Sequence, residues 1–226
     1  MKLLLSGGGS DQDSFELDNI FIESIDKTKP VLYIPIAINT KKHSYSDCLG
    51  WLKNNFKKFS FDNFVMWSEE ELQNNEEKDF EQFGGVYIGG GNTYKLLSEL
   101  KSFGTFDILR KIANKRVPIY GGSAGAIILT DSILNAGYLD KNEIGLSDLS
   151  ALDLTHGYSI WCHYKPEMKD DLIKFQKENK ISRILTLPED AGLFITDNHI
   201  EAIGPNCIVL LDKGSEKIFS PGEMIF

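Results

Sequence analysis

Cysteine is scarce in this chain of 226 residues. The three cysteines, Cys48, Cys162 and Cys207, are an odd number, lie far apart and form no CxxC pair. Disulfide frameworks and structural zinc sites are built from paired or closely spaced cysteines, so neither is expected here. A chain of this length buries enough surface to fold without such cross-links. The sequence therefore predicts a protein of a reducing compartment, the cytoplasm.

Basic residues and long apolar runs are also few. The 24 lysines and arginines are outnumbered by 33 acidic residues, which gives a net charge of −9. Nucleic-acid binding depends on clustered lysine and arginine, so no nucleic-acid partner is expected. The apolar run at 3–5 stops at Gly7 and is shorter than the roughly 7–15 residues of a signal-peptide core. No run reaches the roughly 18 residues of a membrane-spanning helix, so no membrane partner is expected either.

What the sequence does contain is a series of short apolar runs, several of which end in glycine. These runs are too short for helices and are continuous rather than alternating, as in strands covered on both faces. Segments with helical spacing separate them. This alternation predicts an α/β fold with a mostly parallel sheet, right-handed crossovers and ligands at the carboxyl ends of the strands. The expected strands lie at 3–5, 31–37, 64–67, 86–88 and 117–120, and the expected helices at 46–59, 93–100 and 106–114.

The second half of the chain is less regular. Residues 140–153 form a long acidic excursion, and a charged helix is expected at 165–180 before a strand at 181–187. The C-terminal part contains short runs separated by turns, which predict antiparallel strands at a sheet edge, the last of them at 219–226. The chain has no repeat, low-complexity stretch or linker composition, so residues 1–226 are expected to form one domain.

The most specific motif is G-x-S-x-G at 121–125, between an expected strand and an apolar helix start. In a nucleophile elbow, a serine occupies the tight turn from strand to helix, and small neighbours are needed because backbone and helix approach closely. Such a turn presents the Ser123 hydroxyl above the sheet, with the N–H of Ala124 as an oxyanion donor. The alternative is a glycine-rich turn in which Ser123 only caps the helix.

A triple glycine at the end of another expected strand is followed by Asn92 and Thr93. Because they lack side chains, Gly90 and Gly91 leave backbone N–H groups free to face a ligand. We expect the N–H of Gly91 to complete an oxyanion hole. Gly90, Asn92 and Thr93 are expected to bind the substrate. Capping of the next helix is the alternative role for Asn92 and Thr93.

A third glycine cluster, at 7–9, also follows an expected strand. It does not match a dinucleotide-binding loop, because Gln12 stands where the pattern GxGxxG places its last glycine. The sequence therefore assigns no ligand to these glycines.

A serine nucleophile needs a base, usually histidine, and the chain has four histidines. His43 lies among lysines and His199 in an expected hairpin, and both positions favour the surface. His163 follows the apolar run at 158–162, and the end of a strand makes it a better base than His156. Side chains alternate across a strand, so Cys162 should point away from His163 and the two should not form a catalytic pair.

A third group would orient the imidazole and stabilise its charged form. The candidates are the adjacent carboxylates Glu189 and Asp190, after an expected strand, and Asp140 in the acidic excursion. A solvated loop position is the commoner one for an acidic residue. The residues alone do not decide among the three.

Together, these motifs resemble the S51 peptidase family. The resemblance rests on GGGNT at 89–93, G-x-SAGA at 121–126, a histidine at a strand end and LPE at 187–189, in this order. It extends over nearly the whole chain. It implies a doubly wound, mostly parallel α/β sheet with helices on both faces, as in class I glutamine amidotransferases, with short antiparallel strands near the C-terminus. Those amidotransferases place cysteine at this elbow, where the present chain has serine.

The resemblance also implies roles for individual residues. By motif position, the catalytic triad is Ser123, His163 and Glu189. The oxyanion donors are the backbone amides of Gly91 and Ala124. Asp140 falls near an acidic position of the aspartyl dipeptidases and is the second choice for the acid.

The function that the resemblance implies is serine-type hydrolysis of short peptides through an acyl-enzyme, with no cofactor or metal. The aspartyl dipeptidases of the family carry a longer, arginine-bearing loop after the histidine, whereas here 164–167 lead straight into a helix and the next arginine is Arg183. The resemblance thus implies the machinery without the aspartate preference. A hydrolase of other acyl substrates and a non-catalytic module that binds a small molecule are the alternatives. The sequence leaves the oligomeric state open.

Overall fold

The computed structural model describes residues 1–10 and 12–226, which contain two β-sheets. The larger sheet has seven strands, which in spatial order are β3 (Phe64–Met66), β2 (Val31–Ile34), β4 (Gly85–Ile88), β5 (Ile119–Gly122), β1 (Lys2–Ser6), β8 (Gly192–Thr196) and β9 (Ile200–Ile203). The smaller sheet has four, β11 (Ser215–Phe219), β10 (Ile208–Asp212), β7 (Arg183–Leu187) and β6 (Ser159–Cys162).

Helices separate most of the strands along the chain. The α-helices are α1 (Phe15–Ser24), α2 (Tyr45–Phe56), α3 (Glu69–Asn74), α4 (Thr93–Ser102), α5 (Thr105–Asn114), α6 (Ala124–Ile127) and α7 (Lys169–Glu178). Short 3-10 helices are η1 (Lys57–Phe59), η2 (Glu77–Gln82), η3 (Leu134–Tyr138) and η4 (Pro166–Met168). None of the helices in the described part of the chain has the length and apolar character needed to cross a membrane.

The larger sheet is mostly parallel. Its strands β3, β2, β4, β5 and β1 pair in parallel, and β8 and β9 add two antiparallel pairings at one edge. This confirms the α/β fold that strand–helix alternation predicts. It also brings the carboxyl ends of β1, β4 and β5 to the same edge, and each of these strands runs into a glycine cluster.

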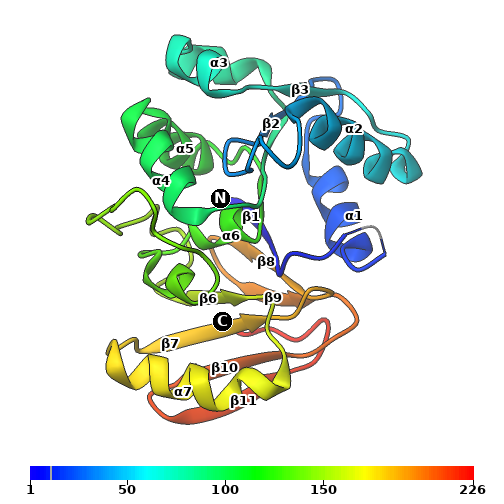
Figure 1. Cartoon of the computed structure of the whole chain (residues 1–226). Helices are drawn as coiled ribbons and strands as arrows, with labels where there is room; N and C mark the ends of the chain where they lie inside the picture. The colour runs from blue at the N-terminus through cyan, green and yellow to red at the C-terminus, as the bar shows by residue number, and fades with distance from the viewer. Residues whose placement is uncertain (11) are drawn as a thin grey trace.

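Side chains of β1 alternate between two cores, which shows that both faces of the larger sheet are covered. Leu3 and Leu5 are fully buried among residues of α4, α5 and α6, whereas Leu4 is fully buried among residues of α1 and α2. Figure 1 shows these two groups of helices on opposite sides of β1. Successive side chains of a strand point to opposite faces, so a strand covered on both faces needs a continuous apolar run.

The smaller sheet packs between the larger sheet and α7. Ile160 and Leu185 belong to the core that also holds Leu3 and Leu5. Trp161 and Ile184 point to the opposite face of the smaller sheet and pack with Leu172 of α7. Figure 1 shows α7 lying along this sheet. The two sheets therefore share one continuous hydrophobic core.

The C-terminal strands depart from the sequence prediction in two ways. β8 and β9 lie at the edge of the larger sheet, but β10 pairs with both β11 and β7 in a second sheet. The expected strand at 219–226 was wrong, because the last strand is Ser215–Phe219 and only a single bridge, from Met224 to Glu201, follows it. Alternating runs identify antiparallel strands, but they do not specify which partner each strand takes.

A buried carboxylate ties α1 to β5. Asp18 is 2% exposed and accepts hydrogen bonds from the hydroxyls of Ser14, at 2.9 Å, and Tyr120, at 3.0 Å. The ammonium of Lys58 lies 3.7 Å away. Burial raises the pKa of Asp18 to about 6, although its hydrogen bonds and Lys58 act in the opposite direction. The Tyr120 ring stacks on Tyr87 with 4.5 Å between ring centroids, so this contact braces the strand that leads into 121–125.

Replacement of Asp18 by asparagine should make stability less dependent on pH. Because folding raises the pKa of Asp18, the folded state disfavours its ionisation, and stability falls as the pH rises through this window. Relative to Asp18→Asn, the free energy of unfolding of the native chain should fall by about 3 kcal/mol between about pH 3 and about pH 7. Urea unfolding of both proteins across this range measures the difference.

Asp26→Asn provides a control of opposite sign. Hydrogen bonds from Thr28 lower the pKa of Asp26, so the native chain should gain stability relative to this variant as the pH rises. If the difference in free energy of unfolding between the native chain and Asp18→Asn stays constant with pH, folding does not raise the pKa of Asp18.

Candidate active site

Ser123 occupies the turn between β5 and α6. Its backbone has φ 50° and ψ −109°, outside the regions that most residues adopt. The flanking glycines are required by close approach: a Cβ on Gly121 would lie 2.4 Å from the carbonyl oxygen of Gly125, and a Cβ on Gly125 would lie 2.3 Å from that of Ile88. The strand, turn and helix around the G-x-S-x-G motif are thus those of a nucleophile elbow.

The Ser123 hydroxyl faces His163 rather than capping the helix. No side-chain capping bond runs from Ser123 to α6, and its Oγ lies 2.8 Å from Nε2 of His163. Nδ1 of His163 lies 3.0 Å from Oε1 of Glu189. His163 directly follows β6 and Glu189 lies two residues beyond β7, so the serine comes from the larger sheet and its two partners from the smaller one. The structure brings the three expected triad residues together in one chain of contacts.

The glycine cluster at 7–9, to which the sequence assigned no role, holds these partners in place. Gly8 has φ +116°, and a Cβ on it would lie 2.2 Å from Cε1 of His163. The carbonyl of Gly7 accepts from the N–H of His163 at 3.0 Å, and the N–H of Gly9 donates to the carbonyl of Glu189 at 3.0 Å. A glycine run at a strand end without a phosphate-binding pattern is the signal that indicates close approach of this kind.

The cluster at 89–91 packs against the serine from the other side. A Cβ on Gly90 would lie 3.3 Å from Cβ of Ser123. Gly91 has φ +141°, and a Cβ there would lie 2.2 Å from the carbonyl oxygen of Ala37. Within residues 1–10 and 12–226, no hydrogen bond uses the backbone N–H of Gly91 or Ala124. The proposed oxyanion donors therefore have unused N–H groups beside Ser123.

Asn92, Thr93 and Asp140 form a separate network at the start of α4. Oδ1 of Asn92 accepts from the N–H of Lys95 at 2.9 Å, which caps the helix. Oδ2 of Asp140 accepts from the N–H of Thr93 at 2.8 Å and from its hydroxyl at 2.6 Å. Of the two capping roles considered, the structure shows that of Asn92, whereas Thr93 is the first residue of α4 and donates to Asp140. Glu189 is the carboxylate that contacts His163. Asp140, the second choice for the acid, instead accepts hydrogen bonds at the first residue of α4.

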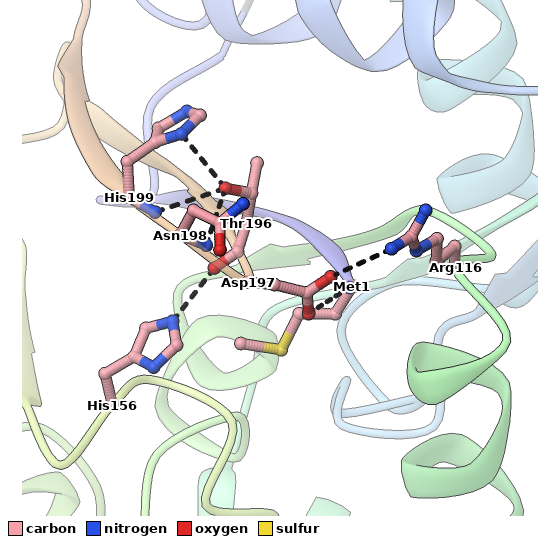
Figure 2. Close-up of polar contacts among 7 residues, drawn as sticks. All are labelled: Met1, Arg116, His156, Thr196, Asp197, Asn198 and His199. Carbon is pink, nitrogen blue, oxygen red and sulfur yellow. Dashed lines mark hydrogen bonds and ion pairs between the residues drawn. The ribbon is translucent and has the colours of Figure 1, made fainter.

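The other histidines lie away from Ser123. Figure 2 shows two of them in a polar cluster at the β8–β9 turn, where Nε2 of His156 lies 2.9 Å from the carbonyl oxygen of Thr196 and Nδ1 of His199 lies 3.0 Å from its hydroxyl. In the same cluster, Asp197 pairs with the Met1 ammonium at 2.5 Å and with Arg116 at 3.7 Å. His43 is exposed. Of the four histidines, only His163 lies beside the serine.

A pocket of about 440 Å³ opens in front of Ser123. Its volume is within the range of small-molecule sites. The pocket is bordered by all three glycine clusters and by the helix start that carries Thr93. Its lining includes Gly8, Gly90, Gly91, Thr93, Asp140 and His163.

This architecture is a peptidase E-like α/β fold. The chain belongs to peptidase family S51, since the model of that family matches residues 2–203. Peptidase E of Haemophilus influenzae strain PittGG is 28% identical over 147 residues, which cover 60% of this chain and 61% of that protein. The chain thus spans about three fifths of the length of this relative.

Two solved structures share the fold. The structure of a peptidase from an acI-B1 actinobacterium matches with a TM-score of 0.71 at 18% identity, covering 99% of this chain and 96% of that one. A peptidase E candidate from Listeria monocytogenes EGD-e matches with a TM-score of 0.68 at 21% identity, covering 91% and 98% of the two chains. Both matches confirm the fold, and the match of the family model to residues 2–203 confirms the family that the sequence motifs resemble.

Gly8→Ala should weaken the reactivity of Ser123 without unfolding the protein. The added methyl group would overlap the imidazole ring of His163, and displacing a base by about 1 Å costs roughly 100-fold in rate. The measurement is the rate at which a fluorophosphonate labels Ser123. Gly104→Ala is the matched control, because Gly104 also has positive φ, +74°, but a Cβ there meets no atom within 4 Å. Equal labelling of the two variants would argue against the role of Gly8.

Glu189 and Asp140, the first and second choices for the acid, should separate in the same labelling assay. Glu189→Gln removes the carboxylate next to Nδ1 of His163 and should slow labelling by roughly 100-fold. A buried triad acid contributes about 10,000-fold. The smaller effect is expected here because the Glu189 side chain is 56% exposed. Asp140→Asn should label at the native rate but lower the free energy of unfolding by about 1 kcal/mol, since it weakens the start of α4. The reverse pattern would make Asp140 the acid.

Proposed function

We propose that this protein is a serine peptidase that cleaves short peptides through an acyl-enzyme on Ser123. The observation that carries the proposal is the chain of contacts at 2.8 Å and 3.0 Å from Ser123 through His163 to Glu189, with the serine on a strand-to-helix turn. A nucleophile within hydrogen-bond reach of a base, which is oriented by a third group, is the arrangement that nucleophilic catalysis needs.

Acylation begins when Oγ of Ser123 attacks the carbonyl carbon of the peptide bond. Nε2 of His163 accepts the hydroxyl proton, and the Glu189 carboxylate stabilises the imidazolium through the hydrogen bond from Nδ1. The carbonyl oxygen becomes an oxyanion, which accepts hydrogen bonds from the N–H groups of Gly91 and Ala124. Donors of this kind contribute roughly 2.7–4 kcal/mol each to transition-state stabilisation.

The tetrahedral intermediate then collapses and the peptide bond breaks. His163 donates its proton to the leaving amine, and the acyl group stays on Ser123 as an ester. A water molecule, deprotonated by His163, attacks the ester and releases the acid and the free serine. These steps use only Ser123, His163, Glu189 and the two backbone amides.

The site favours small substrates. Its pocket of about 440 Å³ accommodates a ligand of dipeptide size and lies within three glycine-rich turns. Peptidase E, to which the chain is similar, is a peptidase by name, which supports peptides as the substrate. Because the catalytic groups come from both sheets, we also propose that residues 1–226 act as a single domain.

Hydrolysis of a panel of dipeptides should depend on Ser123. Ser123→Ala and His163→Ala should each lower kcat/KM by at least about 10,000-fold, because they remove the nucleophile or its base. The measurement is release of free amino acids from each dipeptide. Ser102→Ala is the control, since the exposed Ser102 hydroxyl bonds only to the carbonyl of Glu99 on α4.

Three outcomes would contradict the proposal. Unchanged hydrolysis in Ser123→Ala would show that another group is the nucleophile. Absence of dipeptide hydrolysis, with Ser123 still labelled by a fluorophosphonate, would retain the nucleophile and assign the protein to hydrolysis of other acyl compounds. If no probe labels Ser123, the protein would be a binding module and not a hydrolase.

A further inference from the structure

A second, smaller pocket adjoins Ser123, and its walls are aromatic. Its volume is about 200 Å³. We call it the tyrosine pocket; it is lined by Tyr33, Tyr87, Trp51, Ser6, Ser10 and Ser123, with glycines of the three clusters between them. Trp51 is 42% exposed and borders the pocket from α2, whereas the two tyrosines come from the adjacent strands β2 and β4.

The two tyrosines bring unused hydroxyl groups to this pocket. Tyr33 is 3% exposed and Tyr87 is 7% exposed. The Tyr33 hydroxyl oxygen would lie 3.3 Å from a Cβ on Gly89, and that of Tyr87 3.6 Å from a Cβ on Gly122, and both glycines line the pocket. In the part of the chain that the structure describes, neither hydroxyl has a hydrogen-bond partner. Neither hydroxyl oxygen is among the fully buried polar atoms that lack a partner, so both are accessible from the pocket and available to a ligand.

A neighbouring tyrosine shows that this lack of partners is specific to the pocket. The Tyr120 ring stacks on Tyr87, but its hydroxyl donates to Asp18 at 3.0 Å, on the side of α1. Among the described residues, the aromatic layer thus contains one hydroxyl bonded to a protein group behind the pocket and two accessible hydroxyls without a protein partner facing it.

The pocket suits a neutral group. The described residues that line it are glycine, serine, tyrosine and tryptophan, so none of them carries a charge. Burial raises the pKa of Tyr33 and Tyr87, so both hydroxyls stay neutral. A carboxylate without a cationic partner is costly to bury, whereas a neutral amide or hydroxyl can exchange hydrogen bonds with the two tyrosines.

Arginine does not reach this pocket. Arg183, the first arginine after the catalytic histidine, donates to the carbonyl of His156 at 2.9 Å and packs over the Tyr158 ring at 4.1 Å. Its side chain is therefore occupied near the start of β6, at the end of the strand away from His163.

The position of His163 indicates which part of a peptide the tyrosine pocket would hold. His163 lines the larger pocket and not the tyrosine pocket. The imidazolium must protonate the leaving amine, so the leaving residue belongs on the side of the larger pocket. The other residue of the substrate, whose carbonyl carbon acylates Ser123, then lies on the side of Tyr33 and Tyr87.

We propose that the tyrosine pocket is the specificity subsite for the acylating residue and selects neutral, hydrogen-bonding side chains, above all the amides of asparagine and glutamine. This inference rests on the proposed function, because it assigns one side of the peptide to the pocket. Aspartate and glutamate, which differ from these amides mainly in charge, are the side chains it excludes.

A series of phosphonate probes tests the subsite without requiring turnover. Each probe carries the side chain of asparagine, glutamine, alanine or aspartate next to the phosphorus atom that Ser123 attacks. The native protein should react at least about tenfold faster with the amide probes than with the alanine or aspartate probes, because a buried hydrogen-bonding site discriminates against analogues that lack the partner. The measurement is the second-order rate of inactivation.

Tyr33→Phe and Tyr87→Phe should remove this preference. Each variant loses one hydroxyl and keeps its ring, so the amide probes should slow about tenfold while the alanine probe reacts at its native rate. Tyr158→Phe is the matched control, because Tyr158 is 5% exposed but does not line either pocket.

The results separate the two proposals. If a simple fluorophosphonate without a side chain does not label Ser123, the proposed function fails and the subsite fails with it. If Ser123 is labelled but the aspartate probe reacts fastest, or if the tyrosine variants slow all probes equally, the subsite is wrong and the proposed function stands.

Discussion

The candidate site depends on the backbone contact between the end of β1 and the smaller sheet. Two consecutive carbonyls, at the last residue of β1 and the residue after it, hold the two key residues: Ser6 accepts from the N–H of Ser123 at 3.1 Å, and Gly7 accepts from the N–H of His163 at 3.0 Å. The serine belongs to one sheet and the histidine to the other, so one central strand sets the distance between them. A Cβ on Gly7 would lie 1.9 Å from the carbonyl oxygen of Pro188 and would force the two sheets apart.

This anchoring also accounts for the backbone conformations at the site. Ser123 and His163 have φ of 50° and 53°, values that cost a non-glycine residue roughly 1–3 kcal/mol when the surroundings impose them. Ser123 donates its N–H to the last residue of β1 and His163 to the residue after it, and each follows directly on a strand buried in the shared core. The core thus fixes both residues in conformations that turn their side chains toward one another. Positive φ alone does not identify the site, because His156 adopts it in the distant polar cluster.

The sequence predicted the strands of the larger sheet, Ser123 and His163 from local signals, namely apolar runs, the elbow motif and a strand end. Glu189 was singled out only by the family resemblance, because three carboxylates fitted the residues alone. It did not predict α1, which brings Asp18 to Tyr120, or the second sheet, because the partner of an alternating strand is decided by tertiary packing. The role of the glycines at 7–9 was missed for a related reason. These glycines approach His163, Pro188 and Glu189, which lie about 150 residues or more further along the chain. A pattern of neighbouring residues in the sequence does not record such long-range contacts.

The electrostatics of the site follow from how its charges are placed. The chain has a net charge of −9, yet the pockets on either side of Ser123 have different walls: the larger includes Asp140 and His163, and the tyrosine pocket has no charged wall among its described residues. Asp18, with a pKa of about 6, is largely ionised at neutral pH, and its charge raises the pKa of Tyr87 further, after burial. A negative charge behind a neutral aromatic layer opposes an acidic ligand in front of it. The same buried carboxylate that braces β5 therefore also favours neutral ligands in the tyrosine pocket.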